Sequence, residues 1–446
     1  MSVLRSNEEG VSNLLYNRTF MRKQGAIFSF LFFCGQAAWG DSDFLTLKAC
    51  YGKALQASEA IDISQETVLQ AEAQYRKTFG AALPELLFKY TSIWQDQSGL
   101  DGTGSLGSFT QSPQTEANFR IRKNLFTGYK ELSAVLGGSS FVHQRKYEKN
   151  RAVEKLLSQV AEAFYGASQA EANLNSTQII LGLAQGRVME LKERVRLGRT
   201  READLQAMEY QATTLEAQVV EAQQLREASL DGLSFLVGER IEEALKDENA
   251  NIYDLTSLED YLARGQNRYD IKAKWESLGV AKAAVRVEKA DYFPKADISM
   301  NYYLERSGFR KPIDWDINLG IEFPIWSWNA VRSSVERAES QLREKEKDLE
   351  ETKRKIEVEV RGAYRNYIFA HKKVDLNNKA LQFARKEYEL QVRDYKSNLV
   401  TNVEVLDSLN RLFQAELAAN RSALEARMTE VELKVAAGFL PEEILR

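Results

Sequence analysis

The sequence predicts a mainly α-helical, internally duplicated chain with a short β-hairpin in each half. Three observations lead to this fold class. Five of the six prolines fall in two regions, and long proline-free stretches rich in Ala, Leu, Glu, Lys, Gln and Arg lie between them. Proline clashes inside a helix, so such stretches indicate helices. The chain also repeats itself at an offset close to 200 residues, and two short segments alternate polar and apolar residues as strands do.

Composition excludes several classes of function. The chain has 446 residues, 28% of them charged, with a net charge of −4 and interleaved acids and bases, so nucleic acid is not an expected partner. Two cysteines and two histidines argue against a disulfide framework or a metal cluster. There is no Gly-rich phosphate loop and no nucleophile elbow, so we expect no catalytic site, metal or cofactor. His143 and His371 lie in predicted long helices and are interpreted as structural or surface residues.

The internal repeat is defined by matched positions. Pro84 and Pro294 differ by 210, so the first hairpin carries about ten extra residues, found in the Gly/Ser-rich loop Gln97–Ser112. The pairs at an offset of 200 are 124–127 with 324–327, Gly198 with Asn398, Asp204 with Glu404, and Gly238 with Gly438.

Each repeat is predicted to contain a helix, a β-hairpin, a helix of nearly 70 residues, a tip turn and a shorter helix. A helix over about 329–397 would span about 100 Å, more than a compact globular domain needs. The expected division is 1–40 as an N-terminal extension and signal peptide, 41–238 as the first repeat (hairpin about 84–127, tip turn about 198), 239–255 as a connector, 256–438 as the second repeat (hairpin about 294–327, tip turn about 398) and 439–446 as a C-terminal tail.

The N-terminus has the features of an export signal. A short basic start at Met21–Lys23 precedes the apolar run Ala26–Cys34, and Ala38–Gly40 fits a cleavage site before Asp41. Two alternatives remain: lipidation at Cys34, or an N-terminal tail with an incidental apolar patch.

The predicted strands have one apolar and one polar face. A half-buried sheet on a soluble core would alternate in the same way, but no other strand-rich segment exists to cover two isolated hairpins. A closed membrane barrel with strands from several chains leaves no edge and covers both faces. The apolar face would hold Phe119, Ile121, Ile298, Met300, Trp315, Ile317, Leu319, Ile321 and Phe323, and an aromatic girdle would suit Tyr302, Tyr303, Trp315, Trp326 and Trp328.

The two tip turns follow from local chemistry. A helix reversal favours a residue that tolerates positive φ, which Gly198 and Asn398 do. Thr200 or Thr401 would then cap the next helix, with an acid in its first turn. Capping alone would explain the acids at 204 and 404.

The chain resembles the TolC family of outer-membrane efflux proteins, roughly from Asp41 to Gly438. The resemblance depends on the duplication, the segments Lys123–Gly128 (KNLFTG) and Gly320–Trp328 (GIEFPIWSW), and the two turn motifs. It implies a homotrimer in which four strands from each chain form a twelve-stranded transmembrane β-barrel, continued by a long periplasmic α-helical barrel. Such a protein is not an enzyme. It would lie in the outer membrane and its lipid, as the passive exit duct of a tripartite efflux or type I secretion system.

The same resemblance suggests functional residues. Glu404 and Asp407 would form carboxylate rings at the pore constriction, which favour cations and should have raised pKa values through crowding. Tyr395 would help to hold the tip closed. A periplasmic adaptor protein, itself joined to an inner-membrane transporter, would dock on the tip turns, at Gly198, Thr200, Asp204, Asn398 and Thr401.

This sequence departs from the family pattern at the tip. Val400 replaces a closing arginine, and Arg196 replaces an acid before the first turn. A reversed pair of Arg196 with Asp394 is therefore one hypothesis. A soluble periplasmic coiled-coil adaptor or scaffold is the alternative function, although such adaptors also carry a lipoyl-like β domain, which the sequence lacks. Drugs, metal ions and polypeptides all leave through ducts of this type.

Overall fold

The computed structural model describes residues 44–94, 112–247, 256–307 and 311–445. These residues belong to one compact unit that starts at Phe44. The predicted signal peptide with Cys34, nearly all of the loop Gln97–Ser112 and the second half of the predicted connector lie outside the described residues.

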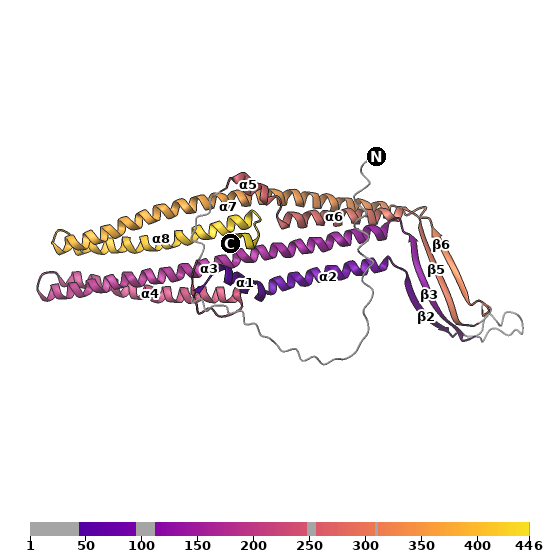
Figure 1. The fold of residues 1–446 in the computed structure, drawn as a ribbon, viewed down its shortest axis with the longest axis horizontal. Coiled ribbons are helices and arrows are strands. Elements are labelled where there is room, and N and C mark those ends of the chain that lie inside the picture. The colour runs from indigo at the N-terminus through magenta and orange to yellow at the C-terminus, as the bar shows by residue number, and fades with distance from the viewer. Residues whose placement is uncertain (1–43, 95–111, 248–255, 308–310, 446) are drawn as a thin grey trace, which may run out of the picture. The chain divides into compact units, whose positions relative to one another are not determined.

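The two repeats have the same order of helices and strands (Figure 1), and the one helix expected before each hairpin is divided in two in both. Two-residue strands β1 (Phe44–Leu45) and β4 (Ala244–Leu245) pair in parallel, and α9 (Pro441–Ile444) ends the described chain. The first repeat comprises α1 (Leu47–Ala57), α2 (Glu59–Ala81), β2 (Glu85–Ile93), β3 (Gln114–Phe126), α3 (Lys130–Arg196) and α4 (Glu202–Val237). The second comprises α5 (Leu258–Gly265), α6 (Tyr269–Lys289), the 3-10 turn η2 (Ala290–Tyr292), β5 (Lys295–Arg306), β6 (Trp315–Glu322), α7 (Ala330–Lys396) and α8 (Asn402–Ala436).

The two long helices, α3 and α7, have 67 residues each, as the proline-free stretches predicted. Gly362 lies within α7 and does not interrupt it. In the described part of the chain, no helix is both long and apolar enough to cross a membrane.

The backbone repeats the 200-residue offset of the sequence. Residues with left-handed φ angles occur in matched pairs, namely Gly128 with Trp328, Tyr129 with Asn329, Gly198 with Asn398, and Gly238 with Gly438. Each pair marks the start or the end of an equivalent helix. The duplication therefore extends to the conformation of the turns, although only some of these positions are glycine.

The helices form a layer four helices wide. Near the tip turns its order is α4, α3, α8, α7, because α3 packs against both α4 and α8, and α8 packs against α7 (Figure 1). Nearer the sheet the order is α2, α3, α6, α7, so α2 takes the place of α4 and α6 that of α8. One edge of the layer is therefore formed by α2 and α4, and the other by α7.

The four longer strands form one antiparallel sheet in the order β2-β3-β5-β6. This is the order of the helices α2, α3, α6 and α7 to which the strands connect. Strands β2 and β6 are the two edges, so each keeps one side without a strand partner among the described residues.

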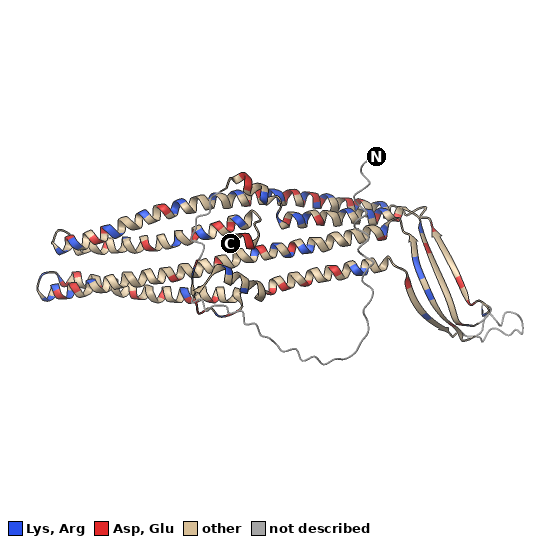
Figure 2. Cartoon of the chain, in the orientation of Figure 1, with Lys and Arg blue, Asp and Glu red and all other residues tan. Residues whose placement is uncertain are grey.

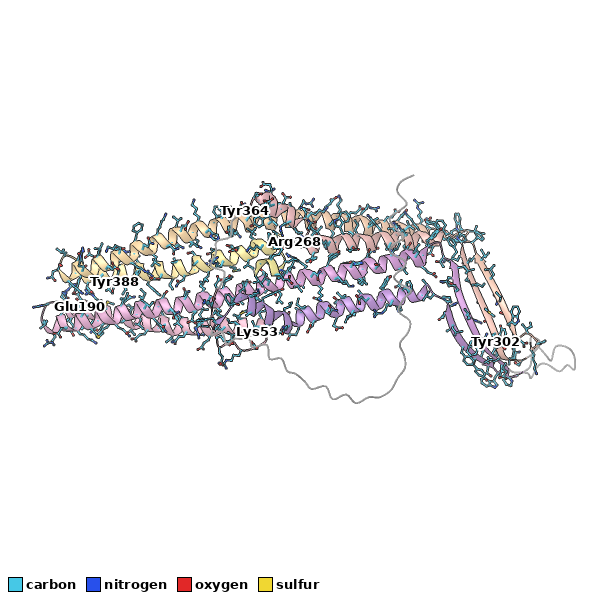
Figure 3. All side chains as sticks on the ribbon, viewed as in Figure 1. Lys53, Glu190, Arg268, Tyr302, Tyr364 and Tyr388 are labelled. Carbon is cyan, nitrogen blue, oxygen red and sulfur yellow. The ribbon has the colours of Figure 1, made fainter. Side chains whose placement is uncertain are left out.

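A buried charged cluster joins the two repeats where α8 ends. Arg151 of α3 donates to Glu154 Oε2 (2.7 Å) and to the carbonyl of Val435 (3.2 Å). Arg268, labelled in Figure 3, donates to the carbonyl of Ala436 (2.8 Å) and to Asp270 Oδ2 (2.6 Å). Burial raises the pKa of Glu154, although Arg151 acts to lower it. The two guanidinium groups satisfy carbonyls that the last turn of a helix leaves unpaired.

Gly128 should be much less replaceable than Gly198, although both have left-handed φ angles. Gly128 has a φ of +64°, and an added Cβ would overlap the carbonyl oxygen of Ala290 and lie 2.9 Å from Phe293 Cβ. Gly198 has a φ of +66° but open space around it. We expect Gly198→Ala to cost about 1 kcal/mol from the left-handed backbone alone, and Gly128→Ala to cost clearly more.

Thermal unfolding followed by circular dichroism in detergent would check this order. Gly52→Ala is the matched control, because Gly52 lies inside α1 with open space around its Cα, so alanine should stabilise the helix slightly. Equal losses of Tm for Gly128→Ala and Gly198→Ala would contradict the packing argument.

Candidate functional site

Both tip turns use the same backbone geometry. Arg199 N donates to Arg194 O (2.8 Å), and Gly198 N donates to Val195 O (2.9 Å). In the second repeat, Leu399 N donates to Asp394 O (2.9 Å), and Asn398 N donates to Tyr395 O (3.0 Å). This pattern satisfies the last carbonyls of the helix and needs a left-handed residue, so Gly198 and Asn398 lie where the sequence predicted them.

The caps of the following helices differ between the repeats. Thr401 is the N-cap of α8, and its backbone N–H (2.6 Å) and hydroxyl (2.8 Å) both donate to Glu404. In the first repeat the N-cap of α4 is Arg201, so the prediction that Thr200 caps this helix is wrong. The Thr200 hydroxyl instead donates to Asp204 Oδ2 (3.2 Å), and Arg201 pairs with the same carboxylate (2.9 Å).

Tyr395, the predicted gating residue, joins the two hairpins. It is only 7% exposed, and its hydroxyl lies 3.1 Å from the hydroxyl of Thr200. The guanidinium groups of Arg187 and Arg194 lie 3.9 Å and 4.9 Å from the centre of its ring. The tyrosine of the second repeat is therefore bound by three residues of the first.

Arg187 was not singled out in the sequence, yet it is the most buried charge near the tip. Its side chain is 3% exposed, and its one ion pair among the described residues is with Glu190, at 2.6 Å. Its Nε and Nη2 atoms have no hydrogen-bond partner there. Figure 3 shows Glu190 and Tyr388 near the tip end of the helices. No sequence pattern marks Arg187, because its role depends on a tyrosine more than 200 positions away.

Polar side chains make further links between the hairpins. Asn402, 3% exposed, donates to the carbonyl of Asp204 (3.1 Å), and Gln211 of α4 donates to Asn410 of α8 (3.0 Å). We call Arg187, Arg194, Thr200, Asp204, Tyr395 and Asn402 the tip latch. The latch brings together three predicted residues (Thr200, Asp204 and Tyr395) and three that were not predicted.

The two predicted constriction carboxylates are exposed but not free. Glu404 accepts the bonds from Thr401, which lower its pKa below the usual value. Within one chain this is opposite to the rise expected from crowding. Asp407 pairs with Arg411 at 2.6 Å, and Arg411 also donates to Glu387 (2.7 Å). Each carboxylate thus has a local partner.

The hypothesised pair of Arg196 with Asp394 is wrong for the single chain. Arg196 pairs with Glu193 at 2.6 Å, and Asp394 pairs with Arg393 at 3.2 Å. Both partners lie one helical turn away or less, so forming these pairs orders little additional chain.

The sheet has the predicted two faces. The polar face is a hydrogen-bonded network in which Asn301 accepts from Arg120 (2.7 Å) and donates to Asp316 (2.7 Å). Tyr303 belongs to this face, since its hydroxyl donates to Asp316 (2.8 Å), so the expectation that it joins Tyr302 in a girdle is wrong. The opposite face is apolar and exposed, and paired strands bring together Leu86, Phe88, Tyr90, Phe119, Ile121, Met300, Tyr302, Trp315, Ile317, Leu319 and Ile321.

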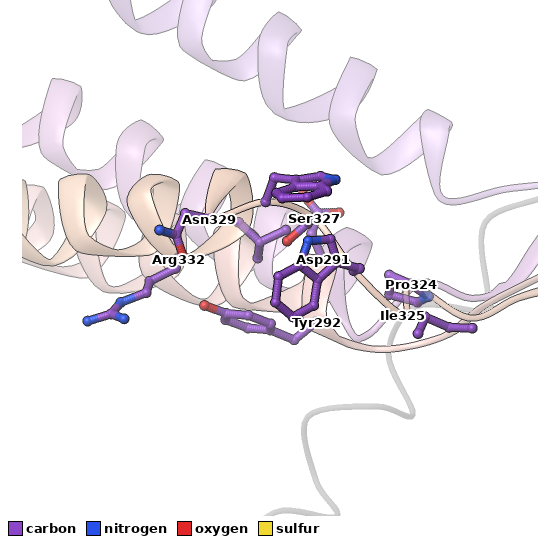
Figure 4. Close-up of a pocket in the computed structure, with 10 residues that line it drawn as sticks. Asp291, Tyr292, Pro324, Ile325, Ser327, Asn329 and Arg332 are labelled. Carbon is purple, nitrogen blue, oxygen red and sulfur yellow. The ribbon is translucent and has the colours of Figure 1, made fainter.

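A pocket of about 270 Å³ lies between the end of β6 and the start of α7 (Figure 4). Asp291, Tyr292 and Arg332 line it together with the segment 324–329. Trp326 and Trp328, 74% and 85% exposed, meet edge to face at 5.7 Å. Trp326 and Trp328, two of the residues expected in an aromatic girdle, therefore lie together at the junction of the sheet with the helices.

The described residues contain no group of three or more His, Cys, Asp or Glu side chains that could hold a metal ion. The candidate functional features of this chain lie at the two ends of the helical layer. The tip latch lies at one end, and the sheet with one apolar and one polar face lies at the other.

Residues 263–439, most of the second repeat, match the model of the outer membrane efflux protein family. Over these residues the chain is similar to that family. The TolC-like resemblance of the sequence is thus confirmed. No curated protein matches the chain.

Solved structures agree with this family in fold. The chain is similar to CusC, with a TM-score of 0.79 at 16% identity, over 88% of this chain and 92% of that one. It is also similar to the outer membrane protein VceC from Vibrio cholerae (TM-score 0.76, 18% identity, 88% and 96% covered). A third is the open state of the MtrE outer membrane channel from Neisseria gonorrhoeae (TM-score 0.74, 18% identity, 88% and 89% covered).

The family match and the shared fold support a role as an exit duct in efflux, in the outer membrane and with a large periplasmic helical part. The family is one of channels, not of enzymes.

The ion pair of Arg201 with Asp204 predicts a pH-dependent contribution to stability at the tip. The hydrogen bond from Arg201 lowers the pKa of Asp204 from its ordinary value of 3.8. A depressed folded-state pKa stabilises the protein above pH 3.8, and this contribution is lost as the pH falls through the lowered value. Asp204→Asn should therefore lower Tm at pH 7, and this effect should disappear as the pH falls through the lowered pKa of Asp204.

Glu202→Gln is the control, because Glu202 is an exposed acid in the same first turn of α4. Thermal unfolding of both variants between pH 2 and 8 is the measurement. A Tm difference for Asp204→Asn that stays constant across this range would contradict the assignment.

Proposed function

We propose that three copies of this chain form the outer-membrane duct, with a β-barrel in the membrane and the helical layers as a periplasmic tunnel. The single observation that carries this is the sheet. It has an exposed apolar face, a hydrogen-bonded polar face and two edge strands. A chain alone leaves that apolar face and those edges in water, where they invite pairing with another copy.

Pairing β6 of one chain with β2 of the next would close the sheet in a ring. Four strands from each of three chains give the twelve strands expected from the sequence. The apolar face would meet lipid, and the polar network around Asn301 and Asp316 would line a wet lumen. The exposed Trp326 and Trp328 at the junction suit the membrane interface, where indole rings are favoured.

At the other end, we propose that the tip turns receive a periplasmic adaptor, which links the duct to an inner-membrane transporter. Gly198, Thr200, Asp204, Asn398 and Thr401 lie at or beside the two turns. Leu399, 74% exposed, and Leu197, 49% exposed, add apolar contacts there. Small and apolar residues on a regular turn suit a helical-hairpin tip of matching shape.

The tip latch is proposed as the closing device. Separation of the α3/α4 and α7/α8 hairpins would remove the contacts of Arg187, Arg194 and Thr200 with Tyr395 and that of Asn402 with Asp204. This set replaces the missing arginine and acid lock with cation–π contacts and neutral hydrogen bonds. Glu404 and Asp407 remain the proposed constriction, with Arg411 beside Asp407 as a partial neutraliser.

The duct itself is tested by reconstitution. Purified protein in planar bilayers should give discrete single-channel conductance, and the cellular protein should fractionate with the outer membrane as a heat-sensitive trimer. The alternative function, a soluble periplasmic adaptor or scaffold, predicts recovery in the periplasmic supernatant and no conductance. That result would overturn the proposal.

The latch is tested by a graded pair of substitutions. Tyr395→Phe keeps the ring on Arg187 and loses only the hydroxyl contact, so the open probability should rise slightly. Tyr395→Leu removes both and should raise it by about tenfold or more, since a desolvated cation–π contact contributes about 2 kcal/mol. Single-channel recording measures both variants. Equal open probability for wild type and Tyr395→Leu would show that the latch does not close the pore.

A further inference from the structure

The two edges of the helical layer carry opposite charge. Bases of α7 that face α8 find acids there: Lys373 pairs with Glu425 (2.7 Å) and Arg385 with Glu416 (2.6 Å). Acids of α4 that face α3 are also bonded, as Glu209 is to Lys192 (3.0 Å). The outward faces of α4 and α7 differ from these inner ones.

The outward face of α7 is basic and apolar. One row of bases and one row of apolar residues recur every seven residues along α7, and residues seven apart lie on the same side of a helix. Both rows lie on the side away from α8, whereas Lys373 and Arg385 face it. Phe369, Leu376 and Phe383 of the apolar row are 66%, 58% and 76% exposed. The face also holds the acids Asp375 and Glu389, the second of which lies 3.5 Å from Lys386. The basic row is Arg365, Lys372, Lys379, Lys386 and Arg393.

Three members of this basic row lack partners. Within the described residues, Arg365, Lys372 and Lys379 form no ion pair or hydrogen bond. They are exposed and flank the apolar row. Figure 2 shows basic positions along this part of α7.

The outward face of α4 is acidic and apolar. Heptad spacing from the buried residues Leu205, Ala212 and Leu233 places Tyr210, Val220, Glu221, Glu227, Asp231 and Phe235 on the side away from α3. Tyr210, Val220 and Phe235 are 74%, 63% and 83% exposed. That side of the helix has no Lys or Arg, and the three acids form no ion pair or hydrogen bond among the described residues.

The unpaired charges lie at matching distances from the tips. Glu221, Glu227 and Asp231 follow the first residue of α4, Glu202, by 19, 25 and 29 residues. Lys379, Lys372 and Arg365 precede the last residue of α7, Lys396, by 17, 24 and 31 residues. Within each matched pair the two counts differ by one or two residues, which is about 3 Å or less along a helix. The bonds of Tyr395 with Thr200 and of Asn402 with Asp204 hold both tips at one level.

We infer that α7 of one chain packs against α4 of the next, with Lys379 opposite Glu221, Lys372 opposite Glu227 and Arg365 opposite Asp231. Within a chain these helices are separated by α3 and α8, so only another copy supplies the partner. Rotation about an axis parallel to the helices preserves depth, so residues at equal depth meet. The contact joins two different surfaces of neighbouring copies, so three copies can close as a ring. The inference rests on the proposed assembly of three chains, in which the pairing of β6 with β2 already brings these edges together, and it adds the ion pairs between them and their register.

Cysteine crosslinking tests the register. Glu227→Cys combined with Lys372→Cys, oxidised in purified detergent-solubilised protein, should give covalent dimers and trimers on a non-reducing gel. The native Cys50 is buried, which raises its pKa to about 12, so it should not compete. Glu227→Cys with Lys386→Cys is the mismatched control, displaced by about 21 Å along α7. Equal crosslinking in both variants, or in either single-cysteine variant, overturns the inference.

Charge exchange tests the energetics. Arg365→Glu, Lys372→Glu and Lys379→Glu together should increase trimer dissociation by about tenfold, and so should Glu221→Lys, Glu227→Lys and Asp231→Lys together. All six changes in one chain should restore the trimer. Native mass spectrometry at low and high salt measures the fraction of protein that is trimeric. Triple variants whose trimers are as stable as those of the wild type overturn the proposed α7–α4 contact.

The two proposals fail in different ways. If the wild-type trimer conducts ions but the Glu227→Cys, Lys372→Cys variant does not crosslink, the α7–α4 contact is rejected and the proposed duct is not. A wild-type protein that is monomeric and gives no conductance rejects the duct itself.

Discussion

The axial register of the two repeats depends on two buried arginines. Arg151 reaches from α3, and Arg268 from the residue before α6, to the last carbonyls of α8. Glu154, Asp270 and Glu359 surround them with carboxylates. Arg151, Arg268 and Glu154 are almost fully buried, so an arrangement that removed one of their partners would be costly. The end of α8 is thereby fixed along α3.

The tip follows from this fixed point. With α8 held at its end, 35 helical residues carry the second tip turn to the level of the first. Only at that level does the ring of Tyr395 meet Arg187, and only there does Asn402 reach the carbonyl of Asp204. A slip of one helical turn would move these groups about 5 Å apart. The same register sets the depth of the charged rows on α4 and α7.

Sequence patterns predicted the features that depend on neighbours along the chain. Proline spacing marked both 67-residue helices, and period-two alternation marked the sheet faces. The left-handed turns at Gly198 and Asn398 followed from residue type. Pairings across the layer did not follow in this way. Arg196 and Asp394 have partners on their own helices, and Arg187 has a binding role only because packing brings Tyr395 to it.

Two smaller errors have equally physical causes. Thr200 and Arg201 are adjacent, and the 200-residue offset from Thr401 places the cap at Arg201, although threonine is the better capping residue. Tyr303 was grouped with Tyr302 by composition, whereas adjacent strand residues point to opposite faces. In both cases backbone position decided against residue preference.

The relative strength of the contacts indicates where the hairpins separate first. At the tip, α7/α8 are held to α3/α4 by a buried apolar cluster that includes Leu191, Met208 and Leu409. The polar contacts beside it are weak one by one: a desolvated cation–π contact contributes about 2 kcal/mol and a hydrogen bond about 1 kcal/mol. Further along, Asn420 adds bonds to Ala172 and Ser176. At the end of α8, separation would remove the bonds of the buried Arg151 and Arg268 to the carbonyls of Val435 and Ala436, which contribute about 1.5–3 kcal/mol each. A force on the tips therefore separates the latch before it disturbs the arginine cluster. Opening is then a bend of the hairpins about a fixed end, and the register that reassembles the latch on closing is preserved throughout.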